Sequence, residues 1–301
     1  MDVGATAPQS TRQVMLREMI SEARRMLEQG GIESAEQEAF WIVEHVLGLA
    51  AHHIVVDQDR PLSHIELSVV RRLIERRVGR EPLQYILGTQ EFCGLEFDVN
   101  PAVLIPRPET ELLVEYVEQR ISVEQQAIIV DVCTGSGCIA VVIARLRPRA
   151  RMIAIDLSPP SLDVARHNAA RHAVDDRIRW LEGDLLGPLA KQCLEGHVDI
   201  IVSNPPYIPE AELPLLQPEV RQFEPLGALV AGPQGTELHE RLLQEAGQYL
   251  TPGGALVMEI GTGQAPALRR IIDQSFGYRF HQLVYDAAGR ERVVIVERTG
   301  T

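Results

Sequence analysis

The sequence contains almost no lysine: of its 29 lysine and arginine residues, only Lys191 is lysine. Basic residues are also outnumbered, because 42 acidic residues leave a formal net charge of −13. This charge argues against a protein whose surface is built mainly to grip the phosphate backbone of a nucleic acid. A local basic patch remains compatible with it.

Other features are missing as well. The four cysteines show no C-x-x-C spacing, and the adjacent His52 and His53 have no carboxylate pattern nearby, so we expect reduced thiols and no metal site. No apolar run approaches the ~18 residues of a membrane span, and the amino terminus has no charged segment followed by an apolar one. We therefore expect a cytoplasmic protein that does not enter a membrane.

The length and composition predict two domains of unequal size. With 301 residues, 45% of them hydrophobic, the chain can bury a large core. We expect a helical bundle over residues 1–80, a hairpin-bearing connector rich in proline and glycine over 81–110, and an α/β domain over 111–301. In the bundle, an apolar helical stripe runs over 14–27, and two further helices begin with capping boxes, Ser34 with Gln37 and Ser63 with Glu66.

Strands and helices alternate beyond Val123, which is typical of a doubly wound parallel sheet. The predicted strands are 127–133, 151–155, 177–182, 198–203 and 255–260, followed by a closing antiparallel pair, 278–285 and 292–297. In such sheets, ligands bind at the carboxyl ends of the strands. Candidate functional residues are therefore those that follow each strand.

The first strand leads into the glycine-rich loop Asp131-Val132-Cys133-Thr134-Gly135-Ser136-Gly137-Cys138. Its glycines let the backbone approach a ligand closely, and the helix behind it favours anionic oxygens. The loop has neither the G-x-G-x-x-G pattern nor a following G-K-[ST], which disfavours a nicotinamide or P-loop site. Asp156, at the end of the second strand, can accept both hydroxyls of a ribose, and Gly183-Asp184-Leu185 after the third can meet an adenine ring.

The apolar run Val198–Ser203 ends abruptly at Asn204-Pro205-Pro206-Tyr207, because proline cannot donate a ladder hydrogen bond. The prolines also stiffen this segment. The side-chain oxygen of Asn204 and the carbonyl of Pro205 can each accept one hydrogen of a planar NH2 group, while the ring of Tyr207 covers it. The sequence thus predicts a receptor for an amide or amino nitrogen, although a proline-rich turn without function would fit this segment alone.

Taken together, these residues resemble the seven-stranded S-adenosylmethionine-dependent methyltransferases, and within them the HemK/PrmC family. The resemblance covers nearly the whole chain. It rests on the glycine-rich loop, the Asn-Pro-Pro-Tyr segment and the further motifs Glu81-Pro82-Leu83-Gln84-Tyr85-Ile86-Leu87-Gly88, Leu104-Ile105-Pro106-Arg107-Pro108-Glu109-Thr110-Glu111, Glu224-Pro225-Leu226, Pro252-Gly253-Gly254 and Glu259-Ile260-Gly261.

The resemblance implies a Rossmann-like fold with a small helical domain that binds the substrate protein. It also implies methylation of the glutamine side-chain amide in the Gly-Gly-Gln motif of class I peptide chain release factors, by a monomer that does not act on nucleic acid. S-adenosylmethionine would be bound by Asp131, Cys133, Thr134, Gly135, Ser136, Gly137, Asp156, Asp184, Leu185 and Asn204. The acceptor would be held by Arg107, Pro108 and Glu109 together with Asn204, Pro205, Pro206 and Tyr207, of which the last four are the expected catalytic residues.

Two departures from the family pattern stand out. Cys133 replaces a common glycine, which the loop tolerates if its φ is negative, and Pro233-Gln234-Gly235-Thr236 replaces an acidic-Gly-Leu sequence. Cys133 also resembles a sister family that methylates a glutamine of a large-subunit ribosomal protein. Three alternatives therefore stay open: that activity, amino-methylation of adenine in nucleic acid, and a partner-binding protein with a vestigial pocket.

Overall fold

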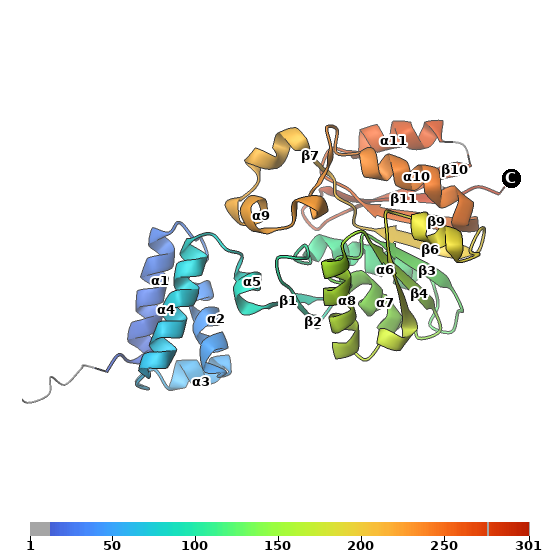
Figure 1. The fold of residues 1–301 in the computed structure, drawn as a ribbon. Helices are drawn as coiled ribbons and strands as arrows, with labels where there is room; N and C mark the ends of the chain where they lie inside the picture. Colours follow the sequence, from blue (N-terminus) through green and yellow to red (C-terminus); the bar gives the residue numbers. More distant parts are fainter. Residues whose placement is uncertain (1–12, 276, 301) are drawn as a thin grey trace, which may run out of the picture. The chain divides into compact units, whose positions relative to one another are not determined.

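The computed structural model describes residues 13–275 and 277–300. The chain divides into two compact units between Leu87 and Gly88, a point that lies inside the predicted connector (Figure 1). Within the described ranges, no helix is both long enough and apolar enough to cross a membrane.

The first unit consists of helices around their own apolar core. Its elements are α1 (Leu16–Gln29), α2 (Ala35–Leu47), α3 (Ala51–Val56), α4 (His64–Val78) and α5 (Leu83–Leu87). The capping box at the start of α4 is confirmed: Glu66 N donates to Ser63 Oγ at 3.2 Å, and Ser63 N donates to Glu66 Oε2 at 2.7 Å. The short helices α3 and α5 were not predicted.

The predicted capping box at Ser34 is wrong. Ser34 has φ −93° and ψ 32°, outside the extended conformation of a side-chain cap, and its hydroxyl makes no cap bond. Instead, Ser34 Oγ donates to Glu38 Oε1 at 2.9 Å. Glu38 pairs with the buried Arg77, whose Nε lies 2.6 Å from Oε2. Ser34 therefore orients one partner of a buried ion pair.

The second unit is built on a seven-stranded sheet with the order β10-β11-β9-β6-β3-β4-β5. Its strands are β3 (Ile128–Val132), β4 (Arg151–Asp156), β5 (Ile178–Glu182), β6 (Val198–Ser203), β9 (Leu250–Glu259), β10 (Tyr278–Tyr285) and β11 (Glu291–Arg298). The strands from β9 to β5 run parallel, while β11 and β10 are antiparallel to their neighbours. The predicted Rossmann-like fold, including its closing antiparallel pair, is confirmed.

Helices cover both faces of the sheet, as Figure 1 shows. They are α6 (Glu111–Arg120), α7 (Cys138–Leu146), α8 (Pro159–Arg171), α10 (Glu237–Tyr249) and α11 (Ala265–Gln274). The short helix α9 (Pro218–Phe223) belongs to the excursion after β6 and buries none of its residues. Alternate strand residues face opposite layers, so Ile129 packs in the core with α6 and α7, while Val130 packs in the core with α10 and α11. Strands buried on both faces explain the continuous apolar runs of the sequence.

The order of the strands creates a crevice beside β3. The chain proceeds from β3 through β4 to β5 in one direction, then returns to form β6 on the other side of β3. Adjacent connections therefore leave toward opposite sides of the sheet, and ligands bind at such a switch point. The glycine-rich loop after β3 and Asn204 after β6 flank this crevice.

Two small two-stranded sheets accompany the large one. They are the antiparallel hairpin of β1 (Thr89–Phe92) and β2 (Leu95–Asp98), and the parallel pair of β7 (Ile208–Pro209) and β8 (Val230–Gly232). The hairpin buries Phe92 and Phe97 in the core beside α6 and α7. Asn168 of α8 holds its end, accepting from Asp98 N at 2.8 Å and donating to Asp98 O at 3.0 Å. The segment that follows is thereby anchored to the sheet unit.

Candidate active site

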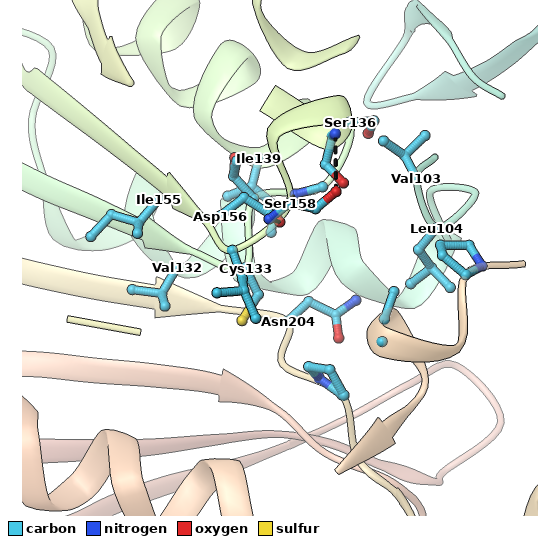
Figure 2. A pocket seen from close by; sticks show the side chains of 18 of the residues that line it. Val103, Leu104, Val132, Cys133, Ser136, Ile139, Ile155, Asp156, Ser158 and Asn204 are labelled. Carbon is cyan, nitrogen blue, oxygen red and sulfur yellow. Dashed lines mark hydrogen bonds between the residues drawn. The ribbon is translucent and has the colours of Figure 1, made fainter. Parts of the chain in front are cut away.

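A cavity of about 660 Å³ opens at the carboxyl ends of the parallel strands. Its walls come from residues 102–110, the glycine-rich loop, the ends of β4 and β5, the segment after β6, residues 225–228 and α10. Figure 2 shows Cys133, Asp156 and Asn204 gathered around it from three different strands. All of its lining residues belong to the second unit.

Ten of the predicted site residues line this cavity. They are Arg107, Cys133, Thr134, Gly135, Ser136, Asp156, Asp184, Leu185, Asn204 and Pro206. Six others are not among the lining residues that the structure describes, namely Pro108, Glu109, Asp131, Gly137, Pro205 and Tyr207. The structure therefore places predicted cofactor-binding residues and predicted acceptor-binding residues around the same cavity.

Asp131 lies beneath the glycine-rich loop. Its side chain is fully buried, and Thr134 Oγ1 donates to its Oδ2 at 2.6 Å. Burial raises the pKa of this carboxyl to about 7, because the charged form loses its hydration. Asp131 thus holds the conformation of Thr134, which does line the cavity.

The condition under which the loop would tolerate cysteine without strain, a negative φ at Cys133, is not met, because its φ is +61°. Positive φ is costly for residues other than glycine. The chain adopts it here where β3 ends and turns into the loop, in the conformation that the family's usual glycine adopts without strain. Gly137 has φ +78°, and a Cβ there would lie 2.9 Å from Cβ of Ala165, so this position requires glycine for α7 to approach α8.

Asp156 connects the tips of two strands. Its Oδ2 accepts from Gly135 N at 2.9 Å, and its Oδ1 accepts from Ser158 N at 2.9 Å. Burial raises the pKa of this carboxyl, although these backbone donors oppose the shift. Nearby, Asp184 Oδ2 lies 2.7 Å from Arg241 Nη2. Both carboxylates line the cavity and offer acceptors to a ligand.

At the other end of the cavity, the carboxamide of Asn204 is fixed by a residue far away in the sequence. Its Nδ2 donates to Thr110 Oγ1 at 3.1 Å. Thr110 donates in turn to Glu259 Oε2 at 2.6 Å, and the hydroxyl of Tyr207 donates to Glu259 Oε1 at 3.1 Å. Asn204 and Tyr207 are therefore joined through one buried carboxylate.

Arg107 links the Pro-Arg-Pro-Glu-Thr-Glu motif to the Glu224-Pro225-Leu226 motif. Its guanidinium pairs with the buried carboxylate of Glu224, and burial raises the pKa of Glu224 while Arg107 opposes that shift. The neighbouring Glu109 Oε1 lies 3.4 Å from Arg292 Nη2 and 3.6 Å from Arg290 Nη2. Arg107 thus lies at the cavity with its charge balanced, and Glu109 is engaged with β11 and the turn before it.

The segment 233–236, whose sequence differs from the family pattern, packs against Tyr207. Gly235 has φ +78°, and a Cβ there would lie 2.6 Å from Tyr207 O, so only glycine fits. The same carbonyl of Tyr207 accepts from Gln264 Nε2 at 2.9 Å. This segment therefore packs against Tyr207 without the acidic-Gly-Leu sequence.

Thr110 and Glu259 were not among the predicted site residues. Both occur in motifs that were recognised, Pro-Arg-Pro-Glu-Thr-Glu and Glu-Ile-Gly, but 149 positions separate them. The apolar wall formed by Val103 and Leu104 was also not predicted, although Leu104 is the first residue of the motif that contains Thr110. Both motifs can be recognised in the sequence, but the hydrogen bond that joins them cannot.

Two family models match the chain: the PrmC N-terminal domain over residues 18–88 and the methyltransferase small domain over residues 108–215. A release factor glutamine methyltransferase of Geobacter sulfurreducens is 42% identical over 93% of this chain and 95% of its own length. One of Moorella thermoacetica is 40% identical over 94% and 98%. A solved methyltransferase structure from Pyrococcus furiosus shares the fold, with a TM-score of 0.50 at 18% identity over 69% of this chain and 91% of that one.

The sheet and the second model define the class, which is that of the Rossmann-like methyltransferases that use S-adenosylmethionine. Within that class, the chain belongs to the release factor glutamine methyltransferase family, because relatives of that name match it at about 40% identity over almost its whole length.

The cavity suits S-adenosylmethionine in size and chemistry. Its volume of about 660 Å³ is within the roughly 300–1,000 Å³ of small-molecule sites. The carboxylate of Asp156 lies at the tip of β4, where a ribose diol is accepted in this kind of fold. A side chain at Gly135 would meet no atom within 4 Å, so the loop leaves open space for a ligand there.

Proposed function

We propose that this protein transfers a methyl group from S-adenosylmethionine to the side-chain amide nitrogen, N5, of the glutamine in the Gly-Gly-Gln motif of class I peptide chain release factors. The observation that carries the proposal is the Asn204 carboxamide, held by Thr110 at the edge of the cavity with its oxygen free of any hydrogen bond to the described protein. The family of the chain supports the same substrate.

In this proposal, Asp156 binds the ribose hydroxyls, and Asp184 and Leu185 meet the adenine. The loop residues Cys133, Thr134, Gly135 and Ser136 enclose the remainder of the cofactor, supported from behind by Asp131 and Gly137. When bound, S-adenosylmethionine supplies a methyl group that is electrophilic because it is attached to a sulfonium sulfur.

An amide nitrogen is a poor nucleophile, because its lone pair is delocalised into the carbonyl. We propose that Asn204 Oδ1 and the Pro205 carbonyl each accept one hydrogen of the glutamine amide, while Pro206 and Tyr207 enclose the planar group. This arrangement directs the nitrogen lone pair toward the methyl group. The two acceptors bind more strongly as positive charge develops on the nitrogen, which stabilises the transition state more than the ground state. The S–CH3 bond breaks as the N–CH3 bond forms, and the methylated nitrogen then loses one hydrogen as a proton to water, which leaves a neutral amide.

The residues before α6 complete the acceptor side. Arg107, with Pro108 and Glu109, borders the glutamine-bearing loop in this proposal. The pairing of Arg107 with Glu224 fixes the wall on which that loop would rest.

The helical unit is proposed to bind the body of the release factor, with the protein acting as a monomer in the cytoplasm. Large apolar side chains are exposed on it, among them Trp41 at 43% and Ile65 at 76%, and aromatic side chains such as Trp41 are enriched at protein–protein interfaces. We expect Trp41→Ala to raise KM for the whole release factor severalfold and to leave methylation of a short Gly-Gly-Gln peptide unchanged. An equal change with both substrates would contradict this role.

The function is tested by incubating the purified protein with S-adenosylmethionine and a class I release factor, followed by peptide mass analysis. We expect a gain of one CH2 unit on the glutamine of the Gly-Gly-Gln motif. The control is a release factor with that glutamine replaced, which should gain nothing. Transfer instead to a ribosomal protein or to adenine in nucleic acid would overturn the proposed substrate and retain the fold and cofactor.

A further inference from the structure

Glu259 ends β9 as a buried carboxylate behind the Asn-Pro-Pro-Tyr segment, with only 1% of its surface exposed. Each of its oxygens receives one hydroxyl: Thr110 Oγ1 donates to Oε2 at 2.6 Å, and the Tyr207 hydroxyl donates to Oε1 at 3.1 Å. An ionised carboxylate only accepts hydrogen bonds, so its charge dictates the direction of both bonds.

The direction of the bond between Thr110 and Glu259 also determines how Thr110 bonds to Asn204 at the cavity. A hydroxyl has a single proton, and Thr110 gives that proton to Glu259. Thr110 Oγ1 can therefore only accept from Asn204, which must present its NH2 group, and Nδ2 lies 3.1 Å away. The oxygen of the same carboxamide is left for the ligand.

Resting on the proposed function, we propose that Glu259 and Thr110 are positioning residues that fix the orientation of the Asn204 carboxamide, so that its oxygen and not its NH2 group faces the acceptor amide. The reverse orientation would place two NH2 groups against each other. It would remove the acceptor on which the transfer depends.

Several groups face Glu259 and influence its charge. Burial raises the pKa of Glu259 to about 7, and it is opposed by the Thr110 and Tyr207 hydroxyls and by Arg292 of β11, while Glu109 adds to the increase. His239 of α10 contacts the backbone carbonyl of Glu259, with Nε2 2.8 Å away, and burial lowers the pKa of His239 to about 4, so it stays neutral near pH 7.

Protonation of Glu259 reverses the chain of hydrogen bonds. The acid donates to Thr110 in preference to Tyr207, because a phenol oxygen shares its lone pair with the ring and accepts less well. The Thr110 proton then turns to Asn204, whose oxygen must accept it. The ionised form is therefore the active one, and we expect transfer to rise with pH through about 7 and to level off above it.

The test compares two substitutions at Thr110 in the full-length protein. Thr110→Val keeps the shape and removes the hydroxyl, whereas Thr110→Ser keeps the hydroxyl. With a release factor as substrate and saturating S-adenosylmethionine, we expect the valine variant to lose roughly 30-fold in kcat and the serine variant to stay within about threefold of wild type. Cofactor dissociation constants should agree among all three, and equal kcat values for the two variants would overturn the proposal.

The second measurement needs no substrate protein. The side-chain NH2 resonance of Asn204, identified by its loss in Asn204→Ala, is followed by ¹⁵N NMR between pH 5 and 9. We expect it to titrate near pH 7 in the wild type and in Thr110→Ser, but not in Thr110→Val. A resonance that does not titrate in the wild type would overturn the proposal. Since this readout is independent of methyl transfer, it decides the orientation even where the release factor is not the substrate.

Discussion

The two ends of the cavity are built in different ways. At the glycine-rich end, the decisive contacts join residues close in the chain: Thr134 to Asp131, three positions apart, and Gly135 to Asp156, 21 apart. At the Asn204 end, the contact between Asn204 and Thr110 joins residues 94 positions apart, and the contact between Thr110 and Glu259 joins residues 149 positions apart. One end is a property of local loops, and the other exists only through the tertiary fold. If the glycine-rich end binds the cofactor and the Asn204 end orients the acceptor, substitutions at the first end should lower cofactor affinity and substitutions at the second should lower kcat.

The largest effect is expected from Asn204→Ala. It removes one preorganised acceptor, and we expect kcat to fall roughly 100-fold or more. The dissociation constant of S-adenosylmethionine, measured by calorimetry, should change little. An equal loss of cofactor affinity would mean that the two ends are not separate.

The complementary change is Asp156→Ala. It removes the carboxylate that we propose binds the ribose, and it also frees the backbone N–H groups of Gly135 and Ser158. We expect cofactor affinity to fall roughly 30-fold, while kcat at saturating cofactor stays within a few-fold of wild type. A loss confined to kcat would contradict the assignment of Asp156 to the cofactor.

The smallest effect concerns the conformation of the loop itself. Cys133 has φ +61°, which a β-branched residue tolerates poorly. We expect Cys133→Val to lower the free energy of unfolding by about 2 kcal/mol, and the control Cys133→Gly to stay within about 1 kcal/mol of wild type. Urea unfolding followed by circular dichroism measures both. Equal stability of the two variants would show that the loop relaxes to another conformation.

The same contrast explains what could be predicted from the sequence. Strand β6 and the position of Asn204 follow from an apolar run stopped by two prolines, and the loop after β3 follows from its glycines; both are local signals. The positive φ of Cys133 does not follow, because a strand's exit angle depends on its neighbours in the sheet. The link from Thr110 to Glu259 does not follow either, since no local pattern indicates which distant hydroxyl meets which buried carboxylate.

The helical unit repeats this lesson on a smaller scale. The Ser63 cap was predicted correctly, because a capping box is contained within four residues. Ser34 has the same kind of pattern, yet its hydroxyl bonds to Glu38, which pairs with Arg77 from another helix. A tertiary ion pair therefore outweighed a local preference.

The place of β9 between β6 and β11 has a consequence for synthesis on the ribosome. The nascent chain emerges with β3, β4 and the glycine-rich loop long before β9 and Glu259. A chain that ends before β9 contains every residue of the glycine-rich loop and still lacks the carboxylate that we propose orients Asn204. The orientation of the Asn204 carboxamide therefore depends on a strand that is synthesised after both the glycine-rich loop and Asn204 itself.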